Sequence, residues 1–340
     1  MASHPTTTFE DLSGISTASF TDPYDALLSA CNNNPEEIET RYALHRTTRN
    51  AQQKGKLLSN DFPGVNIDPI LLRLTDQTIE PGYVDPRHCL VFWARPPQHI
   101  KGLIGKIQKE LLTVAPNLWP MPLPNLHMTV LEITHSRTAP EISALVSKLT
   151  PSLPPICSHT LTHRALLIKP LVSYDASALA LSFVPASKAP SPSSSSKKLT
   201  SEDGIENGDE NAIQTAPEYS YHHLRRDIYA LCTEAGMSVD SRYVVPSAHL
   251  TIGRFITGKD FQDEQGNPSS EKLEAFINKI DEINAWLEKE YWPSEDEAAE
   301  VAAGGEWWVG EEKGLVCREG RLWYGDGETV YLGEGYEVQR

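Results

Sequence analysis

Two short stretches of the chain share a pattern that could carry acid–base chemistry at a phosphate. NLHMTVLEI contains His127 and Thr129, and SAHLTIGRF contains His249 and Thr251. In both stretches an apolar residue follows the histidine and another follows the threonine. An imidazole titrates near neutral pH and can move protons, while a hydroxyl can donate a hydrogen bond to a charged oxygen. Each stretch therefore offers a proton-transfer group and an oxygen-binding group two residues apart.

Both stretches are expected to be β-strands, because they are short, apolar and rich in β-branched residues. Side chains alternate between the faces of a strand, so His127 and Thr129 share one face while Met128 packs on the other. In the second stretch, the same alternation would place Arg254 on the face opposite Thr251. The histidine and threonine of one strand would lie roughly 6–7 Å apart, so both could touch one small tetrahedral group.

Two such pairs facing one cleft would supply both proton transfers that phosphodiester cleavage requires. A base activates the attacking water or hydroxyl, and an acid protonates the leaving oxygen. Thr129 and Thr251 would bind the phosphate oxygens as negative charge shifts in the transition state. Neither His127 nor His249 has a carboxylate or a second histidine at i+2 or i+4, so the pattern indicates no metal site and no cofactor. We therefore expect the two histidines to be catalytic in a metal-free reaction.

Single residues of these types are weaker signals. A lone histidine on a strand is more often structural than catalytic, and the interpretation depends on the pattern occurring twice. Tyr243 precedes the second stretch and could stack on a nucleobase or belong to the core. Trp93, inside a buried strand, is expected to be a core residue. Four other histidines are interpreted as structural or exposed: His135, His163, His222 and His223.

The composition along the chain predicts one main domain with extensions. Residues 1–22 are polar and are expected to form a disordered tail, and 23–80 a helical N-terminal extension. Residues 86–335 form the main domain. A Ser-rich, acidic segment at about 185–217 interrupts it and is interpreted as a disordered insertion, because it cannot bury enough apolar surface.

Short apolar runs and amphipathic segments alternate within the main domain. The expected strands are His88–Ala94, Asn125–Ile133, Ala165–Ser173, Ala178–Val184, Ala248–Phe255, Gly305–Val316 and Arg321–Leu332. The expected helices are Gln98–Val114, Ala139–Leu149, Glu218–Ala235 and Ser270–Trp292. Each histidine-bearing strand follows a helix and a loop and precedes another helix. The pattern predicts an α+β, bilobal fold, with two pseudo-repeated lobes of antiparallel sheet, helices packed outside and a central cleft.

Charge is distributed unevenly along the 340 residues, whose net charge is −16. Residues 86–184 carry nine Lys/Arg against four Asp/Glu, whereas residues 260–340 carry seven against 21. The segment with the first pattern is therefore mildly basic, which suits a phosphate-bearing substrate, although solvated faces can differ in charge for no functional reason. The acidic C-terminal part argues against tight binding to long RNA.

The five cysteines are scattered and form no C-x-x-C, which indicates reduced thiols in an intracellular protein, cytoplasmic or nuclear. The chain has no run of 18 apolar residues and no basic and apolar leader at its start, so we expect neither a membrane span nor a secretory signal. We expect a monomer, and the sequence does not identify any protein partners.

The two stretches resemble the paired motifs of the two-histidine phosphoesterase superfamily, which includes the RNA-ligase-like cyclic nucleotide phosphodiesterases. The resemblance covers roughly residues 86 to 335. It implies two lobes flanking a cleft and metal-free chemistry at 2′,3′-cyclic phosphates or related nucleotide phosphodiesters. It also implies that His127 and His249 are catalytic and that Thr129 and Thr251 bind phosphate. Within the family the second histidine often activates the attacking water, which would make His249 the base and His127 the acid.

Three functions remain open from the sequence. The first is hydrolysis of 2′,3′-cyclic phosphates of nucleotides or RNA ends. The second is RNA processing on the same fold, by a 3′-exonuclease or a 2′–5′ RNA ligase. The third is a non-catalytic nucleotide-binding module. The substrate in each case is a nucleotide or an RNA end.

Overall fold

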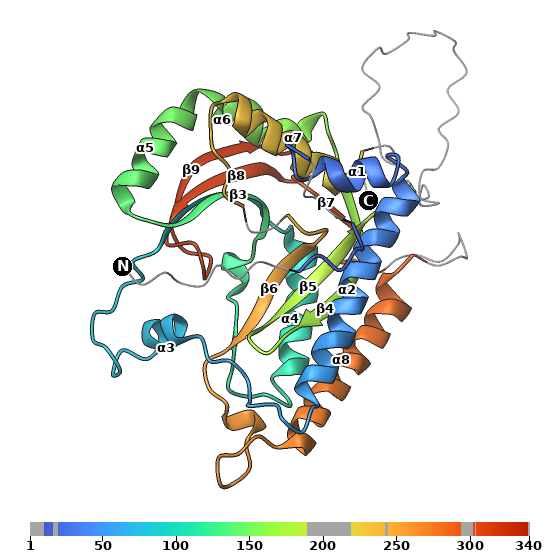
Figure 1. The fold of residues 1–340 in the computed structure, drawn as a ribbon, viewed down its shortest axis with the longest axis vertical. Helices are drawn as coiled ribbons and strands as arrows, with labels where there is room; N and C mark the ends of the chain where they lie inside the picture. Colours follow the sequence, from blue (N-terminus) through green and yellow to red (C-terminus); the bar gives the residue numbers. More distant parts are fainter. Residues whose placement is uncertain are drawn as a thin grey trace.

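One continuous antiparallel β-sheet organises this protein (Figure 1). The structure is a computed structural model and describes residues 10–15, 20–188, 219–241, 244–293, 302 and 304–338. The strands lie in the order β7-β4-β5-β6-β3-β1-β8-β9, and β2 pairs with β6 beside this path. Their bounds are β1 His88–Ala94, β2 Leu118–Pro120, β3 Met128–Arg137, β4 Leu166–Tyr174, β5 Ala178–Pro185, β6 Ala248–Phe255, β7 Trp307–Trp308, β8 Lys313–Gly320 and β9 Glu328–Glu334.

The sheet has two halves that correspond to the two expected lobes. One half is β7-β4-β5-β6 and the other is β3-β1-β8-β9, so the two histidine-bearing strands, β3 and β6, are neighbours at the centre. Met128 of β3 pairs with Leu250 of β6 at this junction, and both side chains are buried in the main core. The predicted bilobal α+β fold of antiparallel strands is thereby confirmed, with the lobes joined edge to edge in a single sheet.

Helices cover both halves of the sheet. Two of them pack on the half that does not contain the strand preceding them in the chain. The helices are α1 Asp25–Ala30, α2 Pro35–Leu57, α3 Pro69–Thr75, α4 Gln98–Leu111, α5 Ala139–Leu149, α6 Leu153–Cys157, α7 Tyr221–Glu234 and α8 Ser270–Tyr291. Helix α4 follows β1 but packs against α8 and β6, while α7 is the next described helix after β5 but packs against β3. This exchange ties the two halves into one core. Among the described helices, none combines the length and the apolar character that crossing a membrane requires.

Local sequence signals explain where the helices start. Thr138 and Glu141 form a capping box at the start of α5, in which each side chain satisfies a backbone N–H group of the first turn. The side chain of Asn34 accepts from two backbone N–H groups at the start of α2, where Pro35 occupies the first turn. These caps fix the helix ends, and the apolar faces of the helices then pack on the sheet.

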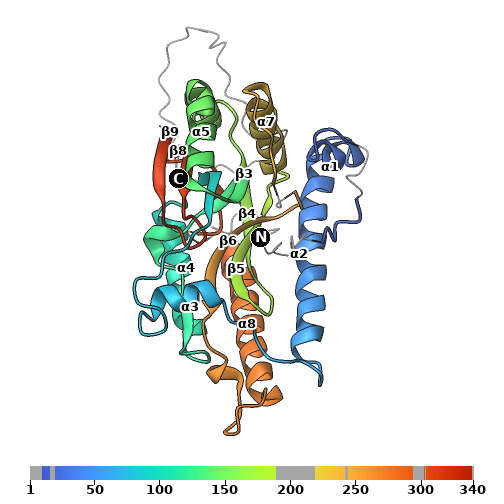
Figure 2. The same ribbon diagram turned by 60° about the vertical axis from the view of Figure 1, so that its left-hand side comes forward.

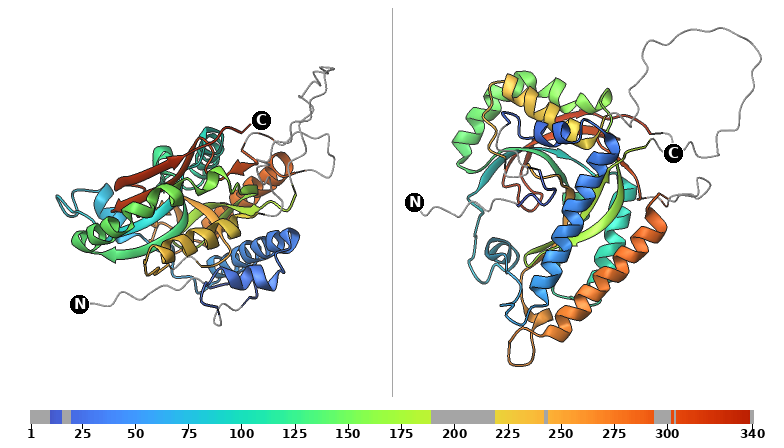
Figure 3. Two further views of the ribbon diagram at one scale, coloured as in Figure 1. Left: turned by 90° about the horizontal axis from the view of Figure 1, so that it is seen from above. Right: turned by 45° about the vertical axis from the view of Figure 1, so that its right-hand side comes forward.

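The N-terminal helices dock onto the main domain through buried polar contacts. The ring of His222 on α7 lies 2.8 Å from the Tyr42 hydroxyl and 2.9 Å from the Tyr24 carbonyl oxygen. The carbonyl can only accept, so Nε2 of His222 donates to it and Nδ1 accepts from Tyr42. Arg225, one turn later, lies over the Tyr24 ring and donates to the backbone carbonyl of Val130 in β3. Figure 3 shows α1 lying beside α7. His222 is thus structural, as expected.

Helix α2 packs against β4 and β5, on the side of the sheet away from α4 (Figure 2). Arg46 donates to the carbonyl of Lys169, and Asn50 to that of Val172. Arg49 forms an ion pair of 2.5 Å with Asp175, in the turn between β4 and β5. The extension is therefore an integrated layer of the fold and packs on β5, the strand that pairs with the one carrying His249.

Several expected element boundaries were wrong for local reasons. Strand β3 starts at Met128 because Leu123–Asn125 form a 3-10 turn. The strand expected over 305–316 is divided into β7 and β8 by a turn at Gly310, whose φ is +86° and where a Cβ atom would collide with the side chain of Thr160. Residues 321–327 form a turn, so the last strand starts at Glu328. The predicted insertion falls almost entirely outside the described residues, as does most of the predicted tail.

Replacing Leu250 by Ala should destabilise the whole domain, because this fully buried side chain lies at the junction of the two halves. We expect the free energy of unfolding to fall by about 2–5 kcal/mol, the usual cost of removing a buried leucine side chain. Urea denaturation followed by circular dichroism measures this change. The matched control is Leu332→Ala on β9, which is 45% exposed and should change stability by less than about 0.5 kcal/mol. Similar losses in the two variants would contradict the assigned role of the junction.

Candidate active site

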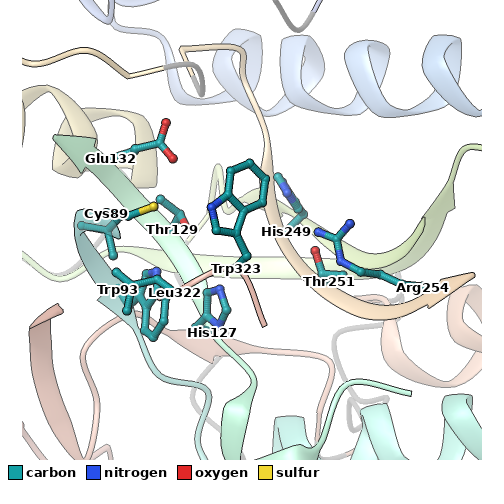
Figure 4. Close-up of a pocket in the computed structure, with 11 residues that line it drawn as sticks. Cys89, Trp93, His127, Thr129, Glu132, His249, Thr251, Arg254, Leu322 and Trp323 are labelled. Carbon is teal, nitrogen blue, oxygen red and sulfur yellow. The ribbon is translucent and has the colours of Figure 1, made fainter. Parts of the chain in front are cut away.

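A single cavity at the junction of the two halves contains both histidine–threonine pairs. His127 and Thr129 line one side of it, and His249 and Thr251 line the other (Figure 4). The cavity volume is about 60 Å³, several times the roughly 10–15 Å³ that one water molecule requires. The remaining lining residues are Cys89, Val91, Trp93, Glu132, Arg254, Leu322 and Trp323.

The pairing of β3 with β6 explains why the four side chains meet. Met128 lies opposite Leu250 in this antiparallel pair, and both point into the core. Continuing the register by one residue in each direction places His127 across from Thr251 and Thr129 across from His249. All four then point to the opposite face, which is the cavity. In a regular ladder the diagonal positions, such as those of the two histidines, lie roughly 7–8 Å apart. The structure thus brings together four of the five candidate site residues, and Tyr243 lies outside the described residues.

The ring of His127 is fixed by two direct contacts, and the loop that carries it is held by Arg95. Its Nδ1 lies 2.8 Å from the carbonyl oxygen of Asn125, so Nδ1 carries a proton and Nε2 is left for the cavity. One face of the ring stacks on Trp93, with 3.8 Å between ring centroids. Arg95 donates to the carbonyls of Asn125 and Leu126, which holds the loop before β3. The orientation of this imidazole is therefore set before any ligand binds.

Trp93 is buried, as expected, but it does not belong to the main core. It lies on the cavity side of β1 in a small separate cluster with Cys89, Val91, Val316 and Leu322. On this face its indole contacts His127 and also lies 4.7 Å from the guanidinium carbon of Arg95. Trp93 is therefore a positioning residue of the site.

The second histidine has a hydroxyl as its ring partner. Nδ1 of His249 lies 2.9 Å from the Ser247 hydroxyl, which can donate or accept. Burial lowers the pKa of His249 to about 4, and the charges of Arg49 and Arg225 add to this effect. Burial likewise lowers the pKa of His127 to about 3, opposed by the Asn125 carbonyl and assisted by Arg95 and Arg254. With these pKa values both imidazoles are neutral at pH 7.

A β-bulge in each central strand brings a charged residue into the cavity. In β6, Thr251 pairs with Ala180 and Gly253 with Leu179, so Ile252 is an extra residue. The expectation that Arg254 lies on the face opposite Thr251 was therefore wrong, because it assumed regular alternation. In β3, the partners of Trp93 and Phe92 are Thr129 and Leu131, so Val130 is extra. As a result Glu132 lines the cavity.

Arg254 is held by the N-terminal extension. Its guanidinium lies 3.6 Å from a carboxylate oxygen of Asp68, which also caps α3 and accepts a hydrogen bond of 2.8 Å from Tyr324. Asp68 therefore connects three parts of the chain at the edge of the site. An arginine held by one carboxylate still has further N–H groups that can bind an anion.

The turn between β8 and β9 supplies the wall of the cavity that carries Leu322 and Trp323. It approaches the His127 loop closely, since a Cβ atom at Gly325 would lie 2.5 Å from the Asn125 carbonyl oxygen. Glycine is therefore required at this position, where φ is +82°. Asn125 in turn donates from its side chain to the Tyr324 carbonyl. The wall and the loop that carries His127 are thus positioned together.

Sequence reasoning missed several residues at or beside the cavity, among them Asp68, Trp93 in its stacking role, Glu132, Leu322 and Trp323. One signal was available. The two patterns extend with equal spacing to a charged residue, as His-x-Thr-x-x-Glu and His-x-Thr-x-x-Arg. Nothing comparable in the sequence marks Asp68 or the turn at 321–327, because their position depends on contacts distant in the chain. Within the ranges that the structure describes, no group of three or more His, Cys, Asp or Glu side chains is placed to hold a metal ion.

Known proteins resemble this chain distantly. No family model and no curated protein matches it. Among solved structures, it is similar to a conserved protein of unknown function from Agrobacterium tumefaciens, with 14% identity, 70% of this chain and 82% of that chain covered, and a TM-score of 0.39. It is also similar to Usb1 from Kluyveromyces marxianus, with 12% identity, 72% and 98% covered, and a TM-score of 0.33. It is similar as well to Usb1 from Kluyveromyces marxianus with uridine monophosphate, with 12% identity, 68% of this chain and 94% of that chain covered, and a TM-score of 0.30. At these TM-scores the similarities carry no argument about function.

Nuclear magnetic resonance should find both active-site imidazoles neutral from pH 8 down to pH 5 in the ligand-free protein. The pKa of each is lowered from 6.5 by burial, so neither gains a proton until the pH falls below 5. Adding inorganic phosphate should raise both pKa values, because a bound anion favours the charged imidazole. The signals can be assigned with His127→Gln and His249→Gln. Titration of either ring near pH 6.5 without phosphate would contradict the assigned burial.

Proposed function

We propose that this protein is a phosphodiesterase of the two-histidine phosphoesterase superfamily that hydrolyses 2′,3′-cyclic phosphates of nucleotides or RNA ends without a metal ion. The observation that carries the proposal is the convergence of two His-x-Thr pairs from adjacent strands on one cavity. Two imidazoles at one phosphate can divide the tasks of base and acid. Besides the imidazoles, the cavity is lined by the hydroxyls of Thr129 and Thr251 and the guanidinium of Arg254, which are hydrogen-bond donors suited to an anion.

In the proposed reaction water attacks the phosphorus of the cyclic phosphate. One neutral imidazole accepts a proton from the water through Nε2, and a new P–O bond forms. The bond from phosphorus to one ribose oxygen breaks, and the second imidazole, protonated, gives its proton to that oxygen. The hydroxyls of Thr129 and Thr251 donate to the non-bridging oxygens, and the fixed charge of Arg254 stabilises the negative charge that develops there.

We assign His127 as the acid and His249 as the base, following the order that is common in the superfamily whose paired motifs these strands resemble. The Asn125 carbonyl accepts from Nδ1 of His127 and thereby favours its protonated form. If Ser247 accepts from Nδ1 of His249, Nε2 is the unprotonated nitrogen of the neutral ring. A bound phosphate raises the pKa of the neighbouring imidazoles, so substrate binding itself would favour protonation of His127.

Replacing either His127 or His249 by Ala should lower kcat for a nucleoside 2′,3′-cyclic phosphate by at least about 10³-fold, since each supplies a proton transfer. Phosphorus NMR of the reaction measures turnover and identifies the product as a 2′- or a 3′-phosphate. Wild-type activity should survive EDTA. The matched control is His135→Ala, further along β3 and outside the cavity, which should keep near-wild-type kcat. Near-wild-type hydrolysis by both active-site variants would exclude the proposed chemistry.

Three other assays separate the alternatives left open by the sequence. End-labelled RNA that is shortened from its 3′ end, while small cyclic phosphates are not hydrolysed, would identify an exonuclease. Formation of a 2′–5′ linkage from a cyclic phosphate end and a 5′-hydroxyl end would identify a ligase. Calorimetric binding of nucleotides without any turnover would identify a binding module.

The pH dependence of kcat/KM should differ from that of kcat. Because kcat/KM reports the free enzyme, in which the pKa of His127 is about 3, the protonated fraction of this acid falls as the pH rises. We expect kcat/KM to decrease from pH 5 to pH 8, by up to about tenfold per unit, while kcat changes less because bound phosphate raises that pKa. Steady-state kinetics on a cyclic phosphate, whose charge is constant over this range, tests this. A kcat/KM that rises with pH would contradict the assignment.

A further inference from the structure

The guanidinium of Arg254 is held from outside its own strand. It forms an ion pair of 3.6 Å with Oδ2 of Asp68, in the N-terminal extension. Its Nε is buried and has no hydrogen-bond partner among the described residues, so this side chain keeps an N–H group for an anion. The place where an anion meets Arg254 therefore depends on how Asp68 is oriented.

Tyr324, in the turn between β8 and β9, helps to orient Asp68. Its hydroxyl donates a hydrogen bond of 2.8 Å to Oδ1 of Asp68. Burial and the neighbouring carboxylate raise the pKa of this hydroxyl, so it stays protonated and remains a donor. Oδ1 also accepts from the first backbone N–H groups of α3. These bonds occupy Oδ1, and the other oxygen, Oδ2, faces Arg254.

The same tyrosine is bonded to the loop that carries His127. Its carbonyl oxygen accepts from Nδ2 of Asn125 at 3.1 Å, and the Asn125 carbonyl accepts from Nδ1 of His127 at 2.8 Å. Gly325, the next residue, allows this close approach, because a Cβ atom there would collide with Asn125. Tyr324 therefore contacts the residue that holds the histidine and also the residue that holds the arginine.

Tyr324 is itself firmly placed. Its side chain is buried, and its ring packs edge-on against Trp119, which pairs with Arg254 between β2 and β6. Arg87, which forms an ion pair with Asp85, donates to the Tyr324 hydroxyl at 3.5 Å. A hydroxyl that accepts one hydrogen bond and donates another has a fixed direction. Tyr324 is not among the residues that line the cavity, so any effect on a ligand is indirect.

We propose that Tyr324 is a positioning residue that fixes Arg254 relative to His127. The proposal rests on the proposed function, because it concerns the cation at the phosphate that these groups would bind. Through Asp68, the hydroxyl holds the guanidinium where negative charge develops on the phosphate. Through Asn125, the backbone of the same residue holds the loop of the proposed acid. A displacement of about 1 Å at a reacting centre can lower a rate by about 10²-fold.

A double-mutant cycle between Tyr324→Phe and Arg254→Gln tests this role. Tyr324→Phe removes only the hydroxyl and keeps the ring and the carbonyl that Asn125 contacts. With Arg254 present, we expect kcat for a nucleoside 2′,3′-cyclic phosphate to fall about tenfold and the Kd for inorganic phosphate to rise about threefold. In the Arg254→Gln background the same change should alter either quantity by less than about 1.5-fold, because the group that Tyr324 positions is absent. Nuclear magnetic resonance titration of the imidazole signals measures the Kd.

Two further variants separate positioning from folding. Asp68→Asn keeps an acceptor for the start of α3 and for the Tyr324 hydroxyl but removes the charge that faces Arg254. Its kcat should also fall about tenfold, and only where Arg254 is present. The matched control is Tyr331→Phe, which removes a hydroxyl from β9 outside the cavity and should leave kcat unchanged. Thermal melting confirms that each variant is folded.

Three results would overturn the role of Tyr324. The first is an equal loss from Tyr324→Phe with and without Arg254, which would indicate a general structural effect. The second is wild-type kcat and Kd in the Tyr324→Phe variant. The third is a wild-type protein that neither hydrolyses a cyclic phosphate nor binds inorganic phosphate.

The outcome is separable from that of the proposed function. Phosphate binding that shows this coupling, with no hydrolysis of any cyclic phosphate, would support the role of Tyr324 and refute the reaction. Hydrolysis that is lost in His127→Ala and His249→Ala, with independent effects of Tyr324→Phe and Arg254→Gln, would support the reaction and refute the role of Tyr324.

Discussion

The arrangement of this site depends on one backbone pairing, between Met128 in β3 and Leu250 in β6. The two side chains point into the core, and this forces the residues on either side of each of them toward the opposite face. Four polar groups from positions more than 100 residues apart in the chain thereby meet without any dedicated loop. A slip of one residue in this register would turn all four into the core, so core packing and site assembly are the same constraint.

The sequence predicted the secondary structure correctly where a local pattern of apolar residues determines it. The strands at 88–94 and 248–255 and the helix at 139–149 were predicted with the bounds that the structure has, because alternation, apolar spacing and caps act over a few residues. It failed where distant contacts decide. The bulges that direct Arg254 and Glu132 into the cavity arise from pairing with β5 and β1. The stacking of Trp93 on His127 and the link from Asp68 to Arg254 likewise join parts of the chain that no local pattern connects.

The parts of the molecule that carry no proposed catalytic group nevertheless define the site. Helices α4 and α7 each cover the half of the sheet that they do not extend, so neither half could keep its core alone. The N-terminal extension contributes Asp68 beside Arg254, and its Arg49 acts on the pKa of His249. Residues outside the two histidine-bearing strands therefore influence the pKa of His249 and the position of Arg254. The extension thus belongs to the enzyme that we propose.

The two central strands share a histidine and a threonine at equivalent places and then differ in charge, with Glu132 on one and Arg254 at the equivalent place on the other. In a homodimer built from two copies of one such strand, the two-fold symmetry axis would place the same residue on both sides of the site. Its phosphate could then enter equally well in either of two directions. Because both strands belong to one polypeptide, their sequences are free to differ, and the nucleotide that we propose as ligand could bind in a single polarity. In the proposed reaction, the different roles of two chemically identical imidazoles would thus originate in their unlike neighbours.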